Sequence, residues 1–193
     1  MAALRMNERL HLVVPIYSED EETVRMYIHS APISREVFES SFMLISRTFA
    51  TIHGSGLGDI AGPRVASLVL RQQATALGDI DGAISLMNEI RRLSNVTLRD
   101  SGVWTTLPYQ EAVTKGLIDG DDMAEAENAI VFFTVASAML KRQLLKELLP
   151  GAVRLWGAQT TSYAFTAFVD SLRTSNAAEN TGETAVPVSL VPF

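Results

Sequence analysis

Two acidic segments next to glycine resemble the start of a calcium-binding loop. They are residues 79–82, Asp-Ile-Asp-Gly, and residues 119–122, Asp-Gly-Asp-Asp. An EF-hand loop needs oxygen ligands at positions 1, 3 and 5, glycine at position 6 and glutamate at position 12. Position 5 is alanine when counted from Asp79 and methionine when counted from Asp119. Both segments fail the pattern, and we predict that they cap helices instead.

A glycine-rich segment, residues 56–61, matches the G-x-G-x-x-A form of a dinucleotide-binding loop. That loop requires a strand before it and a helix that opens within it. Here a predicted helix precedes the glycines, and Pro63 is suited to the first turn of the following helix. We therefore predict a connection between two helices and no nucleotide cofactor.

The three histidines, His11, His29 and His53, are the candidates for a general base or a metal ligand. His11 and His29 lie on neighbouring predicted strands, but no further ligands for a metal accompany them. His53 lies near a predicted helix C-terminus, where a cation is favoured. The chain has no cysteine, and no Gly-x-Ser-x-Gly motif is present. We predict no catalytic residue, metal or cofactor, and hence a protein that is not an enzyme.

Composition limits the classes of partner. The 193 residues are 47% hydrophobic, with a net charge of −6 and an isoelectric point near 5.1. An acidic surface repels nucleic acid, and the absence of cysteine fits a reducing compartment. Residues 1–8 contain no apolar signal core, and the apolar run 129–140 is shorter than the roughly 20 residues of a membrane-spanning helix. We expect a soluble cytoplasmic protein that binds neither nucleic acid nor membrane.

The N-terminal region predicts a β-hairpin over about residues 9–30. Leu10–Tyr17 and Thr23–His29 are rich in β-formers, and the acidic segment 18–22 separates them as a turn. Pro15 has no N–H to donate, so we expect its strand to be an edge at that point. An isolated hairpin is marginal in water, and this one should therefore pack on helices.

Capping residues and breakers divide most of the remaining chain into helices. The predicted segments are a helix over Ser34–His53, a helix that opens at Gly62-Pro63, a helix capped by Asp79 or Asp81, a short hairpin of Val96–Leu98 with Val103–Leu107, a helix over Pro108–Leu117 and a helix capped by Thr160 or Thr161.

The longest predicted helix, Asp121–Leu149, begins with acidic residues, continues with an apolar stretch and ends with Lys141, Arg142 and Lys146. This order of charges suits the helix macrodipole. A helix that is apolar nearly all round has to be buried by other helices or by a partner chain.

These elements predict one mostly helical α+β domain over residues 1–174, in which the hairpin packs on a bundle of about six helices. An extended C-terminal tail follows over residues 175–193. Its first part is small and polar, which is typical of a flexible segment. Its last part, 185–193, is apolar with two prolines, and it either stays flexible or docks on this subunit or the next.

Four segments of the chain together resemble a family of tailed-bacteriophage proteins encoded in the tail-gene region. They are Tyr27–Phe38, Gly62–Ala66, Glu127–Thr134 and Leu155–Ser162. The resemblance covers essentially the whole chain, including the C-terminus that ends in Val-Pro-Phe. Members of this family are usually taken as tail assembly chaperones or small tail proteins.

The resemblance implies a small, acidic, mostly helical chaperone in the host bacterial cytoplasm. Such chaperones bind the long, apolar, helical tape-measure protein and help recruit tail-tube subunits around it. We therefore expect the tape-measure and tail-tube proteins as partners, and a homo-oligomer. The alternative is a structural subunit of the tail or neck that stays in the virion and uses the hairpin and the C-terminal peptide to join neighbouring subunits.

The expected partner-binding residues are apolar side chains from three segments of the chain. For the two helical segments, a role in the protein core is the competing interpretation. The candidates are Phe38, Phe42 and Ile45 on the first long helix, Phe132, Phe133 and Met139 on the longest helix, and Val188, Leu190 and Phe193 in the tail.

Overall fold

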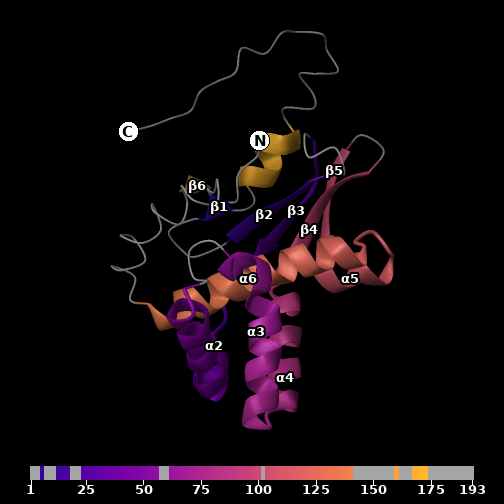
Figure 1. Cartoon of the computed structure of the whole chain (residues 1–193). Helices are drawn as coiled ribbons and strands as arrows, with labels where there is room; N and C mark the ends of the chain where they lie inside the picture. The colour runs from indigo at the N-terminus through magenta and orange to yellow at the C-terminus, as the bar shows by residue number, and fades with distance from the viewer. Residues whose placement is uncertain are drawn as a thin grey trace.

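The segments of the chain that alternate apolar and polar residues lie in one β-sheet. A computed structural model describes residues 5–6, 12–17, 23–56, 61–100, 103–140, 159–160 and 167–173. The strands of this sheet lie in the order β5-β4-β3-β2-β1-β6 (Figure 1). They are β1 (Arg5–Met6), β2 (Leu12–Tyr17), β3 (Val24–Ser30), β4 (Ser94–Asp100), β5 (Val103–Pro108) and β6 (Gln159–Thr160).

Both predicted hairpins are present, and the structure joins them into the same sheet. β2 pairs with β3 and β4 pairs with β5, while β3 and β4 pair antiparallel with Ile28 opposite Val96. β1 pairs with β2 only at Leu12 and Val13. Among the described residues Pro15 therefore has a paired strand on one side only, as its missing N–H predicts. The predicted turn at 18–22 lies outside the described residues.

Two of the helices begin at predicted caps, Ser34 and Asp79. The Ser34 hydroxyl accepts a hydrogen bond from the Val37 N–H at 3.3 Å, and the Asp79 carboxylate accepts one from the Gly82 N–H at 3.1 Å. Pro63 lies in the first turn of its helix. The helices are α1 (Arg35–Ser40), α2 (Phe42–Gly54), α3 (Gly62–Leu77), α4 (Ile80–Arg92), α5 (Tyr109–Thr114) and α6 (Gly120–Met139), and residues 167–173 form a further helix. The predicted helix cap at Thr160 is wrong, because Thr160 pairs in β6, and the alternative cap Thr161 lies outside the described residues.

The predicted helix Ser34–His53 is wrong in one respect, because the structure divides it into α1 and α2. Ser41 separates them, with φ −102° and ψ 11°. The Val37 carbonyl accepts hydrogen bonds from the Ser40 hydroxyl and from the Ser41 N–H, both at 3.0 Å. Serine hydroxyls that bond to the preceding turn compete with the regular helix pattern. The break places Phe42 at the start of α2.

The longest helix, α6, begins near the predicted residue but ends at Met139, so the predicted end at Leu149 is wrong. Leu140 has an extended backbone, with ψ 139°, and no basic residue lies in the last turn. The Ser137 hydroxyl donates to the Thr134 carbonyl at 3.1 Å, a local bond that weakens the end of a helix. The predicted basic end, 141–149, lies outside the described residues.

The apolar part of α6 is buried by other elements of the same chain. Every residue from Ala126 to Val135 is buried, and α6 packs against α2, α3 and β2. Figure 1 shows α6 between the sheet on one side and α2, α3 and α4 on the other. The prediction that this helix must be buried is therefore confirmed.

The strands place alternate residues on the two faces of the sheet. Leu12, Val14 and Ile16 of β2 belong to the main core together with the helices α2 to α6. Val13 faces the opposite side and packs with Phe168 and Val169 of the helix over 167–173. The fold is α+β and mostly helical, as predicted. The single-domain boundary at residue 174 stays a prediction, and the tail 175–193 lies outside the described residues.

Candidate functional site

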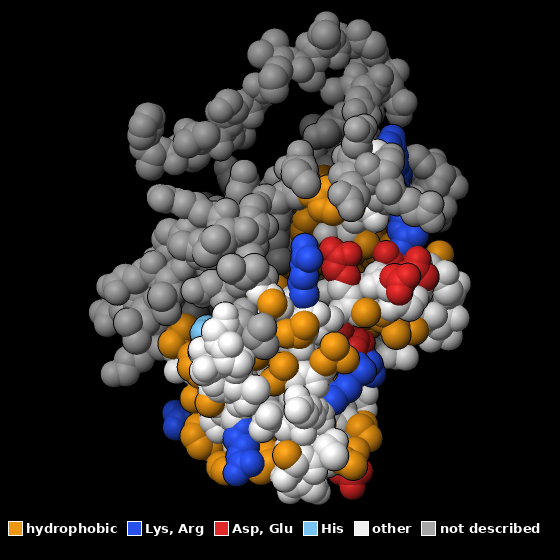
Figure 2. All heavy atoms as spheres, in the orientation of Figure 1, with side chains coloured by type: hydrophobic (Ala, Val, Ile, Leu, Met, Phe, Trp, Pro, Cys, Tyr) orange, Lys and Arg blue, Asp and Glu red, His pale blue; other side chains and the backbone are white. Residues whose placement is uncertain are grey.

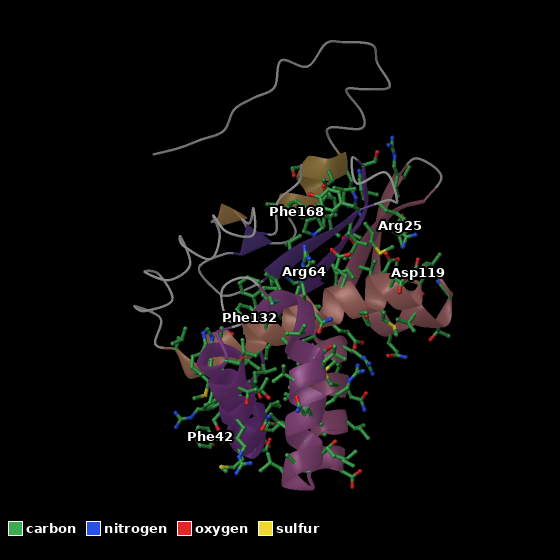
Figure 3. All side chains as sticks on the ribbon, in the orientation of Figure 1. Arg25, Phe42, Arg64, Asp119, Phe132 and Phe168 are labelled. Atoms are coloured by element: carbon green, nitrogen blue, oxygen red, sulfur yellow. The ribbon has the colours of Figure 1, made fainter. Side chains whose placement is uncertain are left out.

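Two of the predicted partner-binding residues, Phe38 and Phe42, lie on the surface where α1 meets α2. Their ring centroids are 5.8 Å apart and the rings are nearly perpendicular, at 85°. Phe38 is half-buried against the core, whereas Phe42 is 45% exposed and the adjacent Met43 is 56% exposed. Figure 3 shows Phe42 at the end of α2 that is farther from α6. We call Phe38, Phe42 and Met43 the aromatic surface.

Other candidates lie in the core or at its margin. Ile45, Phe132 and Phe133 are 0%, 5% and 6% exposed, and Met139 is half-buried near the end of α6. The ring of Phe132 contacts those of Phe133 and His53, with centroids 5.7 Å and 6.2 Å away. These positions support the competing core interpretation, and a partner-binding role for these residues stays a prediction.

The three candidates in the tail, Val188, Leu190 and Phe193, lie outside the described residues. Their roles stay predictions. His11 also lies outside the described residues.

A groove between α3 and α4 was not predicted from the sequence. It has a volume of about 390 Å³ and an apolar lining that includes Ala74, Ile80, Ala83, Ile84 and Met87. Leu86 and Ile90 are buried on the core face of α4, so the exposed Ile80 and Ile84 form a second apolar side of the same helix. That second pair, spaced one helical turn apart, was the signal in the sequence.

Two arginines also line the α3–α4 groove, and both bind one buried carboxylate. Arg91 contacts the Glu127 Oε1 at 2.7 Å, and Arg71 contacts its Oε2 at 3.4 Å. Glu127 is 3% exposed. Next to it, the Asn128 side-chain oxygen accepts hydrogen bonds from the Ser67 N–H and hydroxyl at 2.9 and 2.6 Å. These contacts hold α3 and α4 to α6 and keep the walls of the groove in place.

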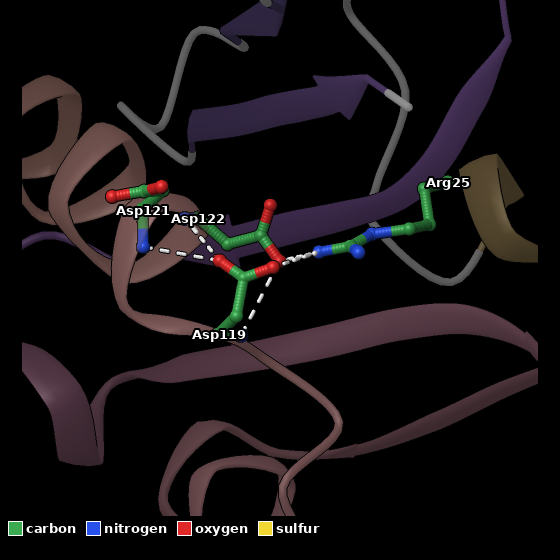
Figure 4. A network of polar contacts seen from close by, with 4 residues as sticks. All are labelled: Arg25, Asp119, Asp121 and Asp122. Atoms are coloured by element: carbon green, nitrogen blue, oxygen red, sulfur yellow. Dashed lines mark hydrogen bonds and ion pairs between the residues drawn. The ribbon is translucent and has the colours of Figure 1, made fainter. Parts of the chain in front are cut away.

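The acidic segment at 119–122 is a helix cap, as predicted. Asp119 accepts hydrogen bonds from the N–H groups of Asp121 and Asp122 at 3.0 and 2.9 Å, and Asp122 completes a capping box (Figure 4). Arg25 of β3 forms ion pairs with Asp119, at 3.3 Å, and with Asp122. This arrangement ties the start of α6 to the sheet.

We expect Asp119→Ala to lower the free energy of unfolding by about 1–2 kcal/mol, because α6 would lose its cap and Arg25 one of its partners. Urea denaturation followed by circular dichroism measures the change. The matched control is Asp81→Ala, which removes an exposed first-turn aspartate from α4 while its cap, Asp79, stays in place. Equal losses in the two variants would contradict the structural importance of this cap.

Perturbed ionisable groups are one sign of catalytic sites, and two occur near the start of α6. Burial raises the pKa of Glu125, and the Arg64 guanidinium partly opposes that rise. Burial also raises the pKa of Tyr17, and the nearby Glu125 carboxylate raises it further. Burial comes first in both cases, so packing explains these shifts without a catalytic role.

The described histidines have the surroundings of structural residues. His29 is buried in β3, and His53 lies in the last turn of α2 with its ring 4.3 Å from that of Phe49. Among the residues that the structure describes, no three His, Asp or Glu side chains are grouped so that they could hold a metal ion. Within the described residues, the aromatic surface and the α3–α4 groove are two features whose apolar side chains suit an apolar partner.

Comparison with protein-family models, with curated proteins and with solved structures found no match. In the part of the chain that the structure describes, no helix combines the length and the apolar character needed to cross a membrane.

Proposed function

We propose that this protein binds other proteins during the assembly of tailed-bacteriophage tails and catalyses no reaction. In this proposal it is a tail assembly chaperone of the host cytoplasm, which binds the tape-measure protein and helps recruit tail-tube subunits. The resemblance of the four sequence segments supports the role. The observation that carries the proposal is the aromatic surface, where Phe42 and Met43 are exposed beside Phe38.

The chemistry of the aromatic surface suits an apolar helix as its partner. A helical client presents apolar side chains at spacings of three and four residues, which lie against such a surface. Methionine adapts its shape to different neighbours, and phenylalanine offers a large apolar area. Covering one such side chain contributes about 1.5–3 kcal/mol. Phe42 and Met43 lie outside the core, so a partner could cover them without unfolding the protein.

Replacing Phe42 and Met43 together with alanine should weaken binding of the tape-measure protein by at least about tenfold. The two side chains together contribute more than about 1.4 kcal/mol when a partner covers them, and 1.4 kcal/mol corresponds to a tenfold change in affinity. The measurement is co-expression with the tape-measure protein of the same tail-gene cluster, followed by affinity capture and quantitative mass spectrometry. The thermal midpoint should change little, since both side chains are exposed.

The matched control replaces two other exposed apolar residues, Val103 and Leu117, with alanine. This control should capture the tape-measure protein as well as the unchanged chain does. Undiminished capture by the Phe42/Met43 variant would remove the aromatic surface as the client site. Failure of the unchanged chain to capture the tape-measure protein would contradict the chaperone proposal itself.

The alternative, a subunit retained in the virion, is favoured by a different observation. Among the described strands, β5 is the last at one end of the sheet, and its first residue, Val103, is 61% exposed. An end strand can pair with a strand of a neighbouring subunit. Mass spectrometry of purified particles separates the two functions, since a chaperone is absent from virions and a structural subunit is present at a fixed copy number.

A further inference from the structure

A short helix over residues 167–173 lies on the outer face of the sheet, which is the face opposite to the main core (Figure 1). We call this helix the cover. Its Phe168 and Val169 are 7% and 6% exposed and pack with Val13 of β2, and Leu172 is partly buried beside them. The other residues of the cover are exposed. The cover is therefore amphipathic, with its apolar side chains on the side that meets the sheet.

Two aromatic residues of the sheet lie next to the cover. The rings of Phe168 and Tyr27 are nearly perpendicular, at 82°, with centroids 5.0 Å apart, and the Tyr27 ring lies 5.5 Å from that of Trp104. Arg173 of the cover donates a hydrogen bond from Nε to the Trp104 carbonyl at 3.2 Å. Figure 3 shows Phe168 where the cover meets the strands. We call Val13, Tyr27 and Trp104, which come from β2, β3 and β5, the outer sheet surface.

The cover depends on this surface for its place, whereas the main core does not depend on the cover. Helices shorter than about 12 residues are marginal in water on their own, so docking has to hold the cover in position. Within the described residues, the cluster of Val13, Phe168 and Val169 shares no member with the main core. An element with few buried contacts opens locally while the rest of the protein stays folded.

We infer that the outer sheet surface is a binding site for an amphipathic helix of a partner protein, and that the cover occupies this site until such a helix displaces it. The cover shows the chemistry that the partner needs. An aromatic residue lies against Tyr27, an apolar residue follows it directly, and a third apolar residue lies one helical turn later. A basic residue at the end of the partner helix takes the place of Arg173 at the Trp104 carbonyl.

The outer sheet surface is separate from the aromatic surface. Figure 2 shows hydrophobic side chains over α2, α3 and α4, which lie on the other side of α6 from the sheet (Figure 1). Phe42 and Met43 belong to α2. A helix bound to the outer sheet surface therefore leaves the aromatic surface free, and the inference does not rest on the proposed function.

The first test asks whether the cover can leave the folded protein. Phe168→Asp puts a charge beneath the cover and should release it, whereas Ala167→Asp makes the same change on its exposed side and should not. The chain has two tryptophans, so both variants also carry Trp156→Phe, which leaves Trp104 as the only one. Phe168→Asp should raise acrylamide quenching of the Trp104 fluorescence several-fold. The thermal midpoint followed by circular dichroism should change little.

Hydrogen exchange measured by mass spectrometry tests the same opening in the unchanged chain. Amides of residues 168–173 should exchange at least about 100-fold faster than those of residues 126–135 in α6, because elements of low local stability exchange without global unfolding. Arg173→Ala keeps every apolar contact of the cover and removes its hydrogen bond to the Trp104 carbonyl. This milder variant should speed exchange of the cover several-fold and leave exchange of α6 unchanged.

The second test offers a helix to the outer sheet surface. The probe is a fluorescein-labelled peptide with the sequence of residues 164–175, and fluorescence anisotropy measures its binding. The Phe168→Asp protein should bind the peptide at least about tenfold more tightly than the unchanged chain, since the apparent affinity falls with the fraction of open sites. The Ala167→Asp protein should bind it as the unchanged chain does. A peptide that itself carries Phe168→Asp should bind none of the proteins.

Unfolding of the main core by Phe168→Asp would overturn the inference, as would exchange of the cover as slow as that of α6, because the cover would then belong to that core. No peptide binding by the folded Phe168→Asp protein would exclude the site. A dimer of the unchanged chain that the peptide dissociates would assign the surface to the cover of a second copy instead of a partner protein. Tape-measure capture by the Phe42/Met43 variant tests a different surface, so failure of the proposed function is distinguishable from these results.

Discussion

Replacing Arg91 with alanine is expected to lower the free energy of unfolding by about 3 kcal/mol, the typical cost of leaving a buried charge without its partner. Glu127 is 3% exposed, and Arg91 makes its shortest contacts, through Nη2 at 2.7 Å and Nε at 2.8 Å to the same carboxylate oxygen. Without Arg91 the carboxylate would lose its closest cationic partner and keep the longer 3.4 Å contact with Arg71. Urea denaturation at neutral pH measures the loss.

Arg71→Ala is the matched control for Arg91, since both guanidinium groups contact the same carboxylate. The Arg71 side chain is 57% exposed and that of Arg91 is 30% exposed, so losing Arg71 should cost less than about 1 kcal/mol. Replacing Glu127 by leucine and Arg91 by methionine together should recover much of the stability, because no buried charge is left. Equal losses in the two single alanine variants would contradict this account.

Phe132→Ala should lower the free energy of unfolding by about 3–5 kcal/mol, the usual cost of removing a buried phenylalanine ring. The ring is 5% exposed and lies against the start of α3. A Cβ atom added to Gly62 would lie 2.5 Å from Phe132 Cε2 and 3.1 Å from Ile52 Cγ2. Gly62→Ala should therefore also destabilise the protein, by about 1–3 kcal/mol through overpacking. Thermal and urea denaturation of each variant measure both effects.

The double variant of Gly62 and Phe132 tests whether the two residues act through this contact. Removing the ring makes room for the added methyl group, so Gly62→Ala should cost clearly less in the Phe132→Ala background. Strictly additive losses would show that the close approach does not matter. A Phe132→Ala protein that keeps its stability but loses the tape-measure protein would support the partner-binding interpretation of this residue over the core interpretation.

The predictions that the structure confirms rest on interactions between residues close in the chain. The caps at Ser34, Asp79 and Asp119 need only a short polar side chain and the N–H groups of the next turn. The two hairpins follow from alternating residues and from a short connection. The break at Ser41 is also local. A serine inside a helical pattern has several possible hydrogen bonds, however, and the sequence does not indicate which of them forms, so the break was not predicted.

Which of the candidate residues are exposed to a partner depends on the tertiary fold. Phe42 and Phe132 are the same residue type in similar apolar patterns, yet one is 45% exposed and the other 5% exposed. The difference arises because α6 is enclosed by the sheet, α2 and α3, whereas the start of α2 lies beyond those contacts. The ion pair of Arg91 could not be predicted from the sequence either, because its partner Glu127 lies on another helix.

By itself, the sequence determined the α+β class, the starts of α1, α3, α4 and α6, the two hairpins and the need to bury α6. These properties follow from periodicity, capping and composition, which act within a few residues. Only the tertiary structure decided the pairing of β3 with β4, the placement of two arginines around Glu127, and the groove that leaves Ile80 and Ile84 exposed. Each of these brings together residues from distant parts of the chain, and such contacts are selected by packing of the whole core rather than by local preference.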